Sequence, residues 1–85
     1  MYEIRMPKLG MDMIQATVVK WLVSEGDEVH KGDPIVQVET EKATVELEAE
    51  EDGILRKIIV AEDTVVEAGQ ILGIITKPGE ELPLQ

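Results

Sequence analysis

Hydrophobic and polar residues alternate symmetrically about one point near the middle of the chain. Suppose that Glu41 and Lys42 are the two loop residues of a β-hairpin. Apolar residues then face apolar ones on one side of the hairpin, and polar residues face polar ones on the other. A slip by one residue would put Val38 and Val45 on opposite faces. The pattern therefore predicts a hairpin with Lys42 at its tip. The predicted pairs are Thr40 with Ala43, Glu39 with Thr44, Val38 with Val45, Gln37 with Glu46, and Val36 with Leu47.

The chain also repeats itself at an offset of 37 residues, so that residues 23–35 align with residues 60–72. Each copy predicts a strand, a turn, a short strand, a turn and a strand, and the β-branched runs 17–23 and 54–60 open the two copies. We therefore predict an all-β domain, a flattened barrel or sandwich of two antiparallel sheets with pseudo-two-fold symmetry, with one sheet from each half. The matched positions are Val23 and Val60, Glu25 and Glu62, Val29 and Val66, and Gly32 and Gly69.

Length and composition bound this picture further. The chain has 85 residues, with one Trp, one Tyr and no Phe, so one small domain with an aliphatic core is expected. The prolines and glutamates of 78–85 predict the start of a flexible linker, which leaves 1–77 as the folded domain. No signal peptide and no apolar run of about 18 residues is present. The prediction is a cytoplasmic protein, or one of the mitochondrial matrix if the source is eukaryotic.

Charge and residue content exclude several classes of function. The net charge is −10, from 18 acidic and 8 basic residues, which disfavours binding to nucleic acid or to an anionic membrane. The absence of cysteine excludes disulfides and thiolate metal sites, so any redox chemistry must arrive on a cofactor. One histidine cannot supply a catalytic triad or a histidine metal site. The acidic run 46–52 lacks the spacing of a calcium loop, so no metal site is predicted.

Four segments of the chain resemble one known family. Together they make roughly residues 2–77 similar to the lipoyl domain of the dihydrolipoamide acyltransferase (E2) component of 2-oxo acid dehydrogenase complexes. The segments are Met6-Pro7-Lys8-Leu9-Gly10-Met11-Asp12-Met13, Trp21 to Ile35 with its two glycine turns, Glu39-Thr40-Glu41-Lys42-Ala43, and Glu51-Asp52-Gly53-Ile54-Leu55.

The resemblance implies a covalent cofactor and a set of recognition residues. Lys42 would carry lipoate in amide linkage, which agrees with the hairpin tip that the alternating pattern places there. Glu41 is a departure, because the family usually has aspartate before the lysine. The residues implied in recognition by the lipoate-attaching enzyme are Glu39, Glu41, Ala43, Gly26 and Gly53. The residues implied in contact with a partner are those of the surface loop, Leu9, Gly10, Met11 and Asp12.

The family's activity gives the expected function. The domain would be a carrier and not an enzyme by itself, and its parent chain would be an acyltransferase. It would accept an acyl group from a thiamine-diphosphate-dependent decarboxylase (E1) and deliver it to the acyltransferase active site of the E2 core. A flavin-dependent dihydrolipoyl dehydrogenase (E3) would then reoxidise the arm. The isolated domain is expected to be a monomer.

Two alternatives stay open at this stage. A biotin carrier domain has a similar barrel and hairpin lysine, but its motif has methionine on both sides of the lysine, and Glu41-Lys42-Ala43 has none. A β-domain that binds a partner without any covalent cofactor belongs to a different class. Gly26 and Gly53 also have structural interpretations, a turn with positive φ and relief of crowding in a strand.

Overall fold

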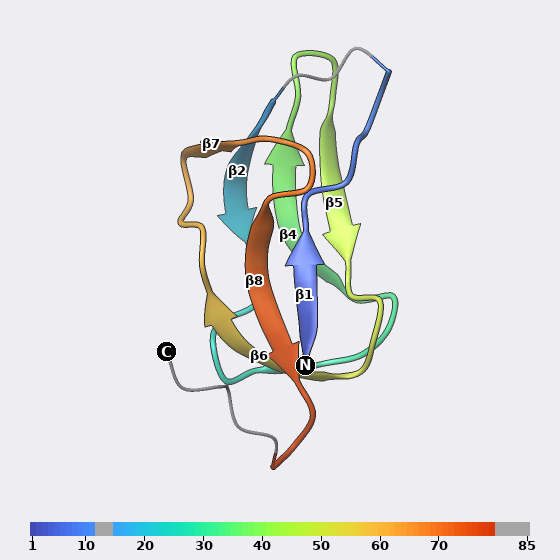
Figure 1. Cartoon of the computed structure of the whole chain (residues 1–85), viewed down its shortest axis with the longest axis vertical. Helices are drawn as coiled ribbons and strands as arrows, with labels where there is room; N and C mark the ends of the chain where they lie inside the picture. Colours follow the sequence, from blue (N-terminus) through green and yellow to red (C-terminus); the bar gives the residue numbers. More distant parts are fainter. Residues whose placement is uncertain (12–14, 80–85) are drawn as a thin grey trace.

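The computed structural model describes residues 1–11 and 15–79, which form eight strands and no helix. Figure 1 shows them as an elongated body with the N-terminus near one end and the β4–β5 hairpin at the other. The all-β prediction is confirmed. The strands are β1 (Tyr2–Arg5), β2 (Ala16–Trp21), β3 (Glu28–Val29), β4 (Pro34–Glu39), β5 (Thr44–Glu48), β6 (Gly53–Ile58), β7 (Thr64–Val66) and β8 (Ile71–Thr76).

The eight strands make two antiparallel sheets of four. One sheet has the order β1-β8-β6-β3 and the other the order β5-β4-β2-β7. A shift of 37 positions carries β2 onto β6 and β4 onto β8, so the repeat in the sequence is a repeat of strands. The pseudo-two-fold arrangement follows, because each sheet has the same order once β5 is matched with β1 and β7 with β3.

One detail of the predicted topology is wrong, because the sheets are not formed one from each half. The short strand β3 of the first half pairs with β6, and the short strand β7 of the second half pairs with β2. After β2 and after β6 the chain crosses to the free edge of the opposite sheet, and backbone hydrogen bonds hold it there. The Gly26 amide donates to the Leu55 carbonyl at 2.7 Å, and the Asp63 amide donates to the Val18 carbonyl at 2.6 Å. The exchange ties the two sheets together.

The core between the sheets is aliphatic, as the composition predicts. Buried and less buried side chains alternate along most of β2 and β4, which is the period-two pattern of strands with one face on a core. The alternation breaks where the strand register shifts, at Val19–Lys20 in β2 and at Ile35–Val36 in β4. Trp21 is 9% exposed, and its indole Nε1 donates to the Val60 carbonyl at 2.8 Å, so its polar atom is satisfied inside the core. The fully buried side chains of the core include Val18, Val29, Val36, Val38, Leu55 and Leu72.

Candidate functional site: the hairpin tip and its groove

The β4–β5 hairpin has the register that the alternating pattern predicts. Val38 pairs with Val45 and Glu39 with Thr44, and the Thr40 amide donates to the Ala43 carbonyl at 2.8 Å. Val38 is fully buried, while Val45 packs against the core from its partly buried position. The base of the hairpin is thus fixed by the core, and Glu41-Lys42 form its two-residue loop. The remaining pairs are Gln37 with Glu46 and Val36 with Leu47.

The Thr40 side chain stabilises the loop by hydrogen bonds to its backbone. Its hydroxyl oxygen accepts from the Ala43 amide at 3.2 Å and from the Lys42 amide at 3.3 Å, and it also lies 3.2 Å from the Ala43 carbonyl, to which it can donate. Threonine hydroxyls often bind backbone groups in this way in turns. Neither loop residue has positive φ, so the turn needs no glycine. Thr40 was not predicted as a site residue, although its type and its place before the loop could have indicated it.

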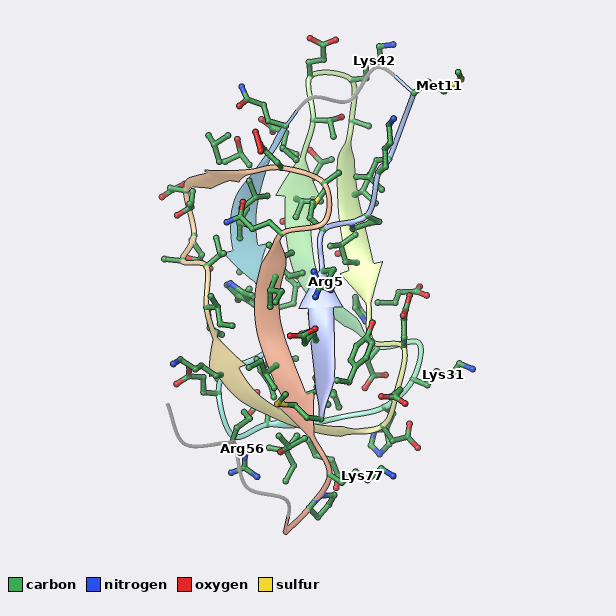
Figure 2. All side chains as sticks on the ribbon, in the orientation of Figure 1. Arg5, Met11, Lys31, Lys42, Arg56 and Lys77 are labelled. Carbon is green, nitrogen blue, oxygen red and sulfur yellow. The ribbon has the colours of Figure 1, made fainter. Side chains whose placement is uncertain are left out.

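Lys42 is exposed at this tip, and Figure 2 shows it at the end of the molecule farthest from Lys77. Among the residues that the structure describes, its ammonium group makes no hydrogen bond or ion pair. Glu39, Glu41 and Ala43 are exposed around it. An amine that is accessible and unpaired on a fixed turn is suited to acylation, so Lys42 fits an amide-linked cofactor.

The loop between β1 and β2 lies at the same end of the molecule. Figure 2 shows Met11 near Lys42, and Leu9, Gly10 and Met11 line one groove together with the hairpin tip. Asp12, the fourth residue predicted to contact a partner, lies outside the described residues. The groove has a volume of about 510 Å³. Its walls also include Gln15, Ala16, Thr17, Glu39, Thr40, Glu41, Lys42, Ala43, Val45 and Val65.

The two predicted recognition glycines lie apart from this tip. Gly26 has φ +95°, the turn conformation that favours glycine. Gly53 is buried, and a Cβ there would lie 2.6 Å from Ile75 Cγ2 and from the Thr76 carbonyl oxygen. Thr76 ends β8, at the end of the molecule opposite the hairpin (Figure 1). Both glycines thus have clear structural roles, and their recognition by a modifying enzyme stays a prediction.

A second hollow, of about 370 Å³, lies at that opposite end between Tyr2 and the acidic residues Glu50, Glu51 and Asp52. The Tyr2 hydroxyl donates to Glu50 Oε2 at 2.7 Å. Burial, together with this hydrogen bond and the nearby carboxylates, raises the pKa of the Tyr2 phenol above its ordinary value. The phenol therefore stays neutral.

The described residues carry neither a metal-binding cluster nor a membrane-spanning helix. Within residues 1–11 and 15–79, no group of three or more His, Asp or Glu side chains could hold a metal ion. No helix of the described residues is long and apolar enough to cross a membrane. The exposed Lys42 on its fixed turn and the groove beside it make the hairpin tip the candidate site.

Comparison with known proteins decides the family. A family model described as "Biotin-requiring enzyme" matches residues 2–75. The solution structure of the lipoyl domain of the 2-oxoglutarate dehydrogenase complex from Azotobacter vinelandii superposes with a TM-score of 0.75 at 31% identity, covering 91% of this chain and 98% of that one. The chain belongs to the biotin–lipoyl family, as one of its lipoyl domains. Lipoyl domains carry lipoate covalently on a lysine.

Curated relatives of this lipoyl domain agree with that assignment. It is 40% identical over 81 residues to the dihydrolipoyllysine-residue acetyltransferase component of the pyruvate dehydrogenase complex of Zymomonas mobilis, covering 94% of this chain and 18% of that protein. It is 36% identical over 81 residues to the dihydrolipoyllysine-residue succinyltransferase component of the 2-oxoglutarate dehydrogenase complex of Bacillus subtilis, covering 95% of this chain and 19% of that protein. The lipoyl domain thus spans less than a fifth of the length of either relative.

Proposed function

We propose that this lipoyl domain carries lipoate on Lys42 and presents it to the enzymes of a 2-oxo acid dehydrogenase complex. The observation that carries the proposal is the position of Lys42, exposed and without a described side-chain partner on a two-residue turn. The bound dithiolane supplies the redox-active disulfide and the acyl-accepting sulfur that a cysteine-free chain lacks. The protein itself contributes position, exposure and charge around that group.

Position is the first contribution of the chain. The pair of buried Val38 and partly buried Val45, together with the Thr40 hydroxyl, holds the base of the arm, so the arm starts from one defined point. A defined starting point raises the fraction of encounters with a partner active site that are productive. The proposed partners are the thiamine-dependent decarboxylase, the acyltransferase core and the dihydrolipoyl dehydrogenase. The proposed modifying enzyme attaches lipoate to Lys42 and recognises the acidic residues beside it.

Mass spectrometry tests the attachment directly. The domain is incubated with a lipoate-attaching enzyme, lipoate and ATP, and the intact mass and the peptide that contains residue 42 are measured. We expect the mass of one lipoyl group on that peptide, and no increase for Lys42→Gln. Lys31→Gln is the matched control, because Lys31 is also exposed on a turn but lies away from the tip (Figure 2). This control should be modified to the same extent as the unsubstituted domain.

Two results would contradict the proposal. One is an unmodified domain in a reaction that modifies the Azotobacter lipoyl domain to completion. The other is full modification of Lys42→Gln, which would place the cofactor on another amine. A mass increase only in the presence of biotin and a biotin-attaching enzyme would instead favour the biotin carrier alternative.

A further inference from the structure

The groove beside Lys42 is open and has largely apolar walls. Leu9 and Met11 contribute from the loop after β1, Val65 contributes from β7, and Val45 contributes from the hairpin itself. Leu9 is 36% exposed, Val65 54% and Met11 92%, so this apolar surface faces solvent. Large apolar side chains that are exposed next to one another commonly mark a site that an apolar ligand or a partner protein covers. Lys42 is itself one of the groove-lining residues.

We propose that this groove receives the apolar part of the lipoyl chain attached to Lys42, so that the arm exchanges between a seated and a projecting position. The inference rests on the function proposed above. The amide bond provides the physical reason, because it removes the ammonium charge that keeps a free lysine in water. After modification, the end of the side chain is a neutral amide followed by methylenes and a dithiolane ring. Contact with Leu9 and Val65 then removes apolar surface from water on both sides.

Geometry and tethering favour seating in this groove over any other apolar surface. Its volume of about 510 Å³ lies within the range of about 300 to 1,000 Å³ of small-ligand sites. Because the chain is anchored at the rim, its effective concentration at the groove is on the order of millimolar or higher. Weak apolar contacts are therefore sufficient to populate the seated position. A partner enzyme would draw the arm out by binding it more tightly than the groove does.

Seating has a chemical consequence that can be measured without any partner enzyme. A dithiolane that spends part of its time against Leu9, Met11 and Val65 is shielded from reductants in solution. Its rate of reduction is therefore proportional to the fraction of time that it projects into solvent. The carboxylates of Glu39 and Glu41, which also line the groove, oppose ionisation of the thiols after reduction.

The first test is an NMR comparison of the domain before and after lipoylation of Lys42, which intact mass confirms. We expect nuclear Overhauser contacts between the lipoyl methylenes and the methyl groups of Val65 and Leu9. We expect none to the methyl groups of Ile59, a similarly exposed residue (47%) that does not line the groove. Contacts to neither residue in a fully lipoylated sample would overturn the inference while leaving the carrier function intact.

The second test is the rate of reduction of the lipoyl group by an uncharged phosphine. An uncharged reductant is needed because the net charge of −10 would repel an anionic one. We expect the lipoylated domain to react about three-fold more slowly than free lipoamide. The double variant Leu9→Gln with Val65→Thr should react at nearly the lipoamide rate. Ile59→Thr is the matched control and should keep the slow rate.

The outcomes separate the two proposals. Reduction of the lipoylated domain as fast as lipoamide, or an equally slow rate in the double variant, would refute seating in this groove. A thermal melt of each variant establishes that it is folded. If the double variant does not fold, the methyl contacts in the unsubstituted domain decide the question. Failure of Lys42 to accept lipoate would remove the carrier function and this inference together.

Discussion

The two ends of this pseudo-two-fold molecule are built from equivalent strands that are connected differently. At one end β4 and β5 are joined by the loop Glu41-Lys42. At the other end their counterparts, β8 and β1, pair side by side without a joining turn, and β1 begins there as β8 ends (Figure 1). The same scaffold thus has a closed hairpin with a fixed amine at one end. At the opposite end, the beginning of β1 lies beside the end of β8.

The equivalence extends to single hydrogen bonds. Glu25 Oε2 accepts from the Ile58 amide at 2.8 Å, and Glu62 Oε2 accepts from the Trp21 amide at 2.9 Å. These residues occupy matching positions of the two copies, so the carboxylates hold the ends of β6 and β2 in the same way. Where matched positions have different residues, the packing or the backbone conformation in one half therefore requires a residue that the other half does not need.

The largest difference that we expect is at Gly53, whose counterpart in the first half is Ala16. A Cβ at Gly53 would lie 2.6 Å from a backbone oxygen, which cannot move aside as a flexible side chain can. Gly53→Ala should reduce the free energy of unfolding by about 2 to 3 kcal/mol, measured by urea denaturation. Ala16→Gly, the matched change in the other half, should cost about 1.5 kcal/mol through backbone entropy and a lost buried methyl group. Equal costs at the two positions would mean that the second half relaxes freely around the added carbon.

The turns after β2 and β6 give a smaller difference. Gly26 has φ +95° and its counterpart Asp63 has φ +67°, while no atom lies within 4 Å of a Cβ built at Gly26. Backbone strain alone should make Gly26→Ala cost about 1 kcal/mol. Asp63→Gly should change the stability by less than about 0.5 kcal/mol, because strain relief is offset by greater freedom of the unfolded chain. Denaturation curves for both variants test the difference.

The same Gly26→Ala variant separates its two predicted roles. If Gly26 serves only the turn, the folded variant should accept lipoate at the rate of the unsubstituted domain. A lower rate of lipoylation in a variant that is still folded would support recognition of this glycine by the modifying enzyme. A cost in stability below that of Asp63→Gly would contradict the turn role.

Local patterns and the internal repeat made the hairpin and the all-β fold predictable, whereas the exchange of the short strands and the far wall of the groove depend on contacts between distant segments. The register of β4 and β5 follows from residues within a few positions of Lys42, since period-two alternation and a two-residue loop leave one pairing. The pairing of β3 and β7 with the opposite sheets could not be predicted from local residues. A strand as short as Glu28–Val29 has no periodicity that assigns it to a sheet. Val65 joins the groove only through the pairing of β7 with β2, far from the lysine in sequence.

The smallest effect that we expect concerns charge at the two ends. Glu39 and Glu46 are exposed on the hairpin that carries Lys42, and amide formation at Lys42 would remove the positive charge among them. We expect this acidic end to steer the domain toward a basic rim on the decarboxylase. Glu39→Gln with Glu46→Gln should therefore lower the rate of reductive acylation about three-fold at low salt, and less at high salt. The decarboxylase that acylates the unsubstituted domain, found by supplying each candidate with its own 2-oxo acid, is the one to use.

A matched pair of substitutions distinguishes local steering from the effect of net charge. Glu28→Gln with Glu51→Gln changes the net charge by the same amount, but these exposed residues lie outside the groove and the hairpin. If position matters, this pair should leave the rate of reductive acylation nearly unchanged. Equal losses for the two pairs would mean that the decarboxylase responds to the charge of the whole domain. No loss for either pair would show that charge at the hairpin end does not guide the encounter, which would leave apolar contact at the groove to do so.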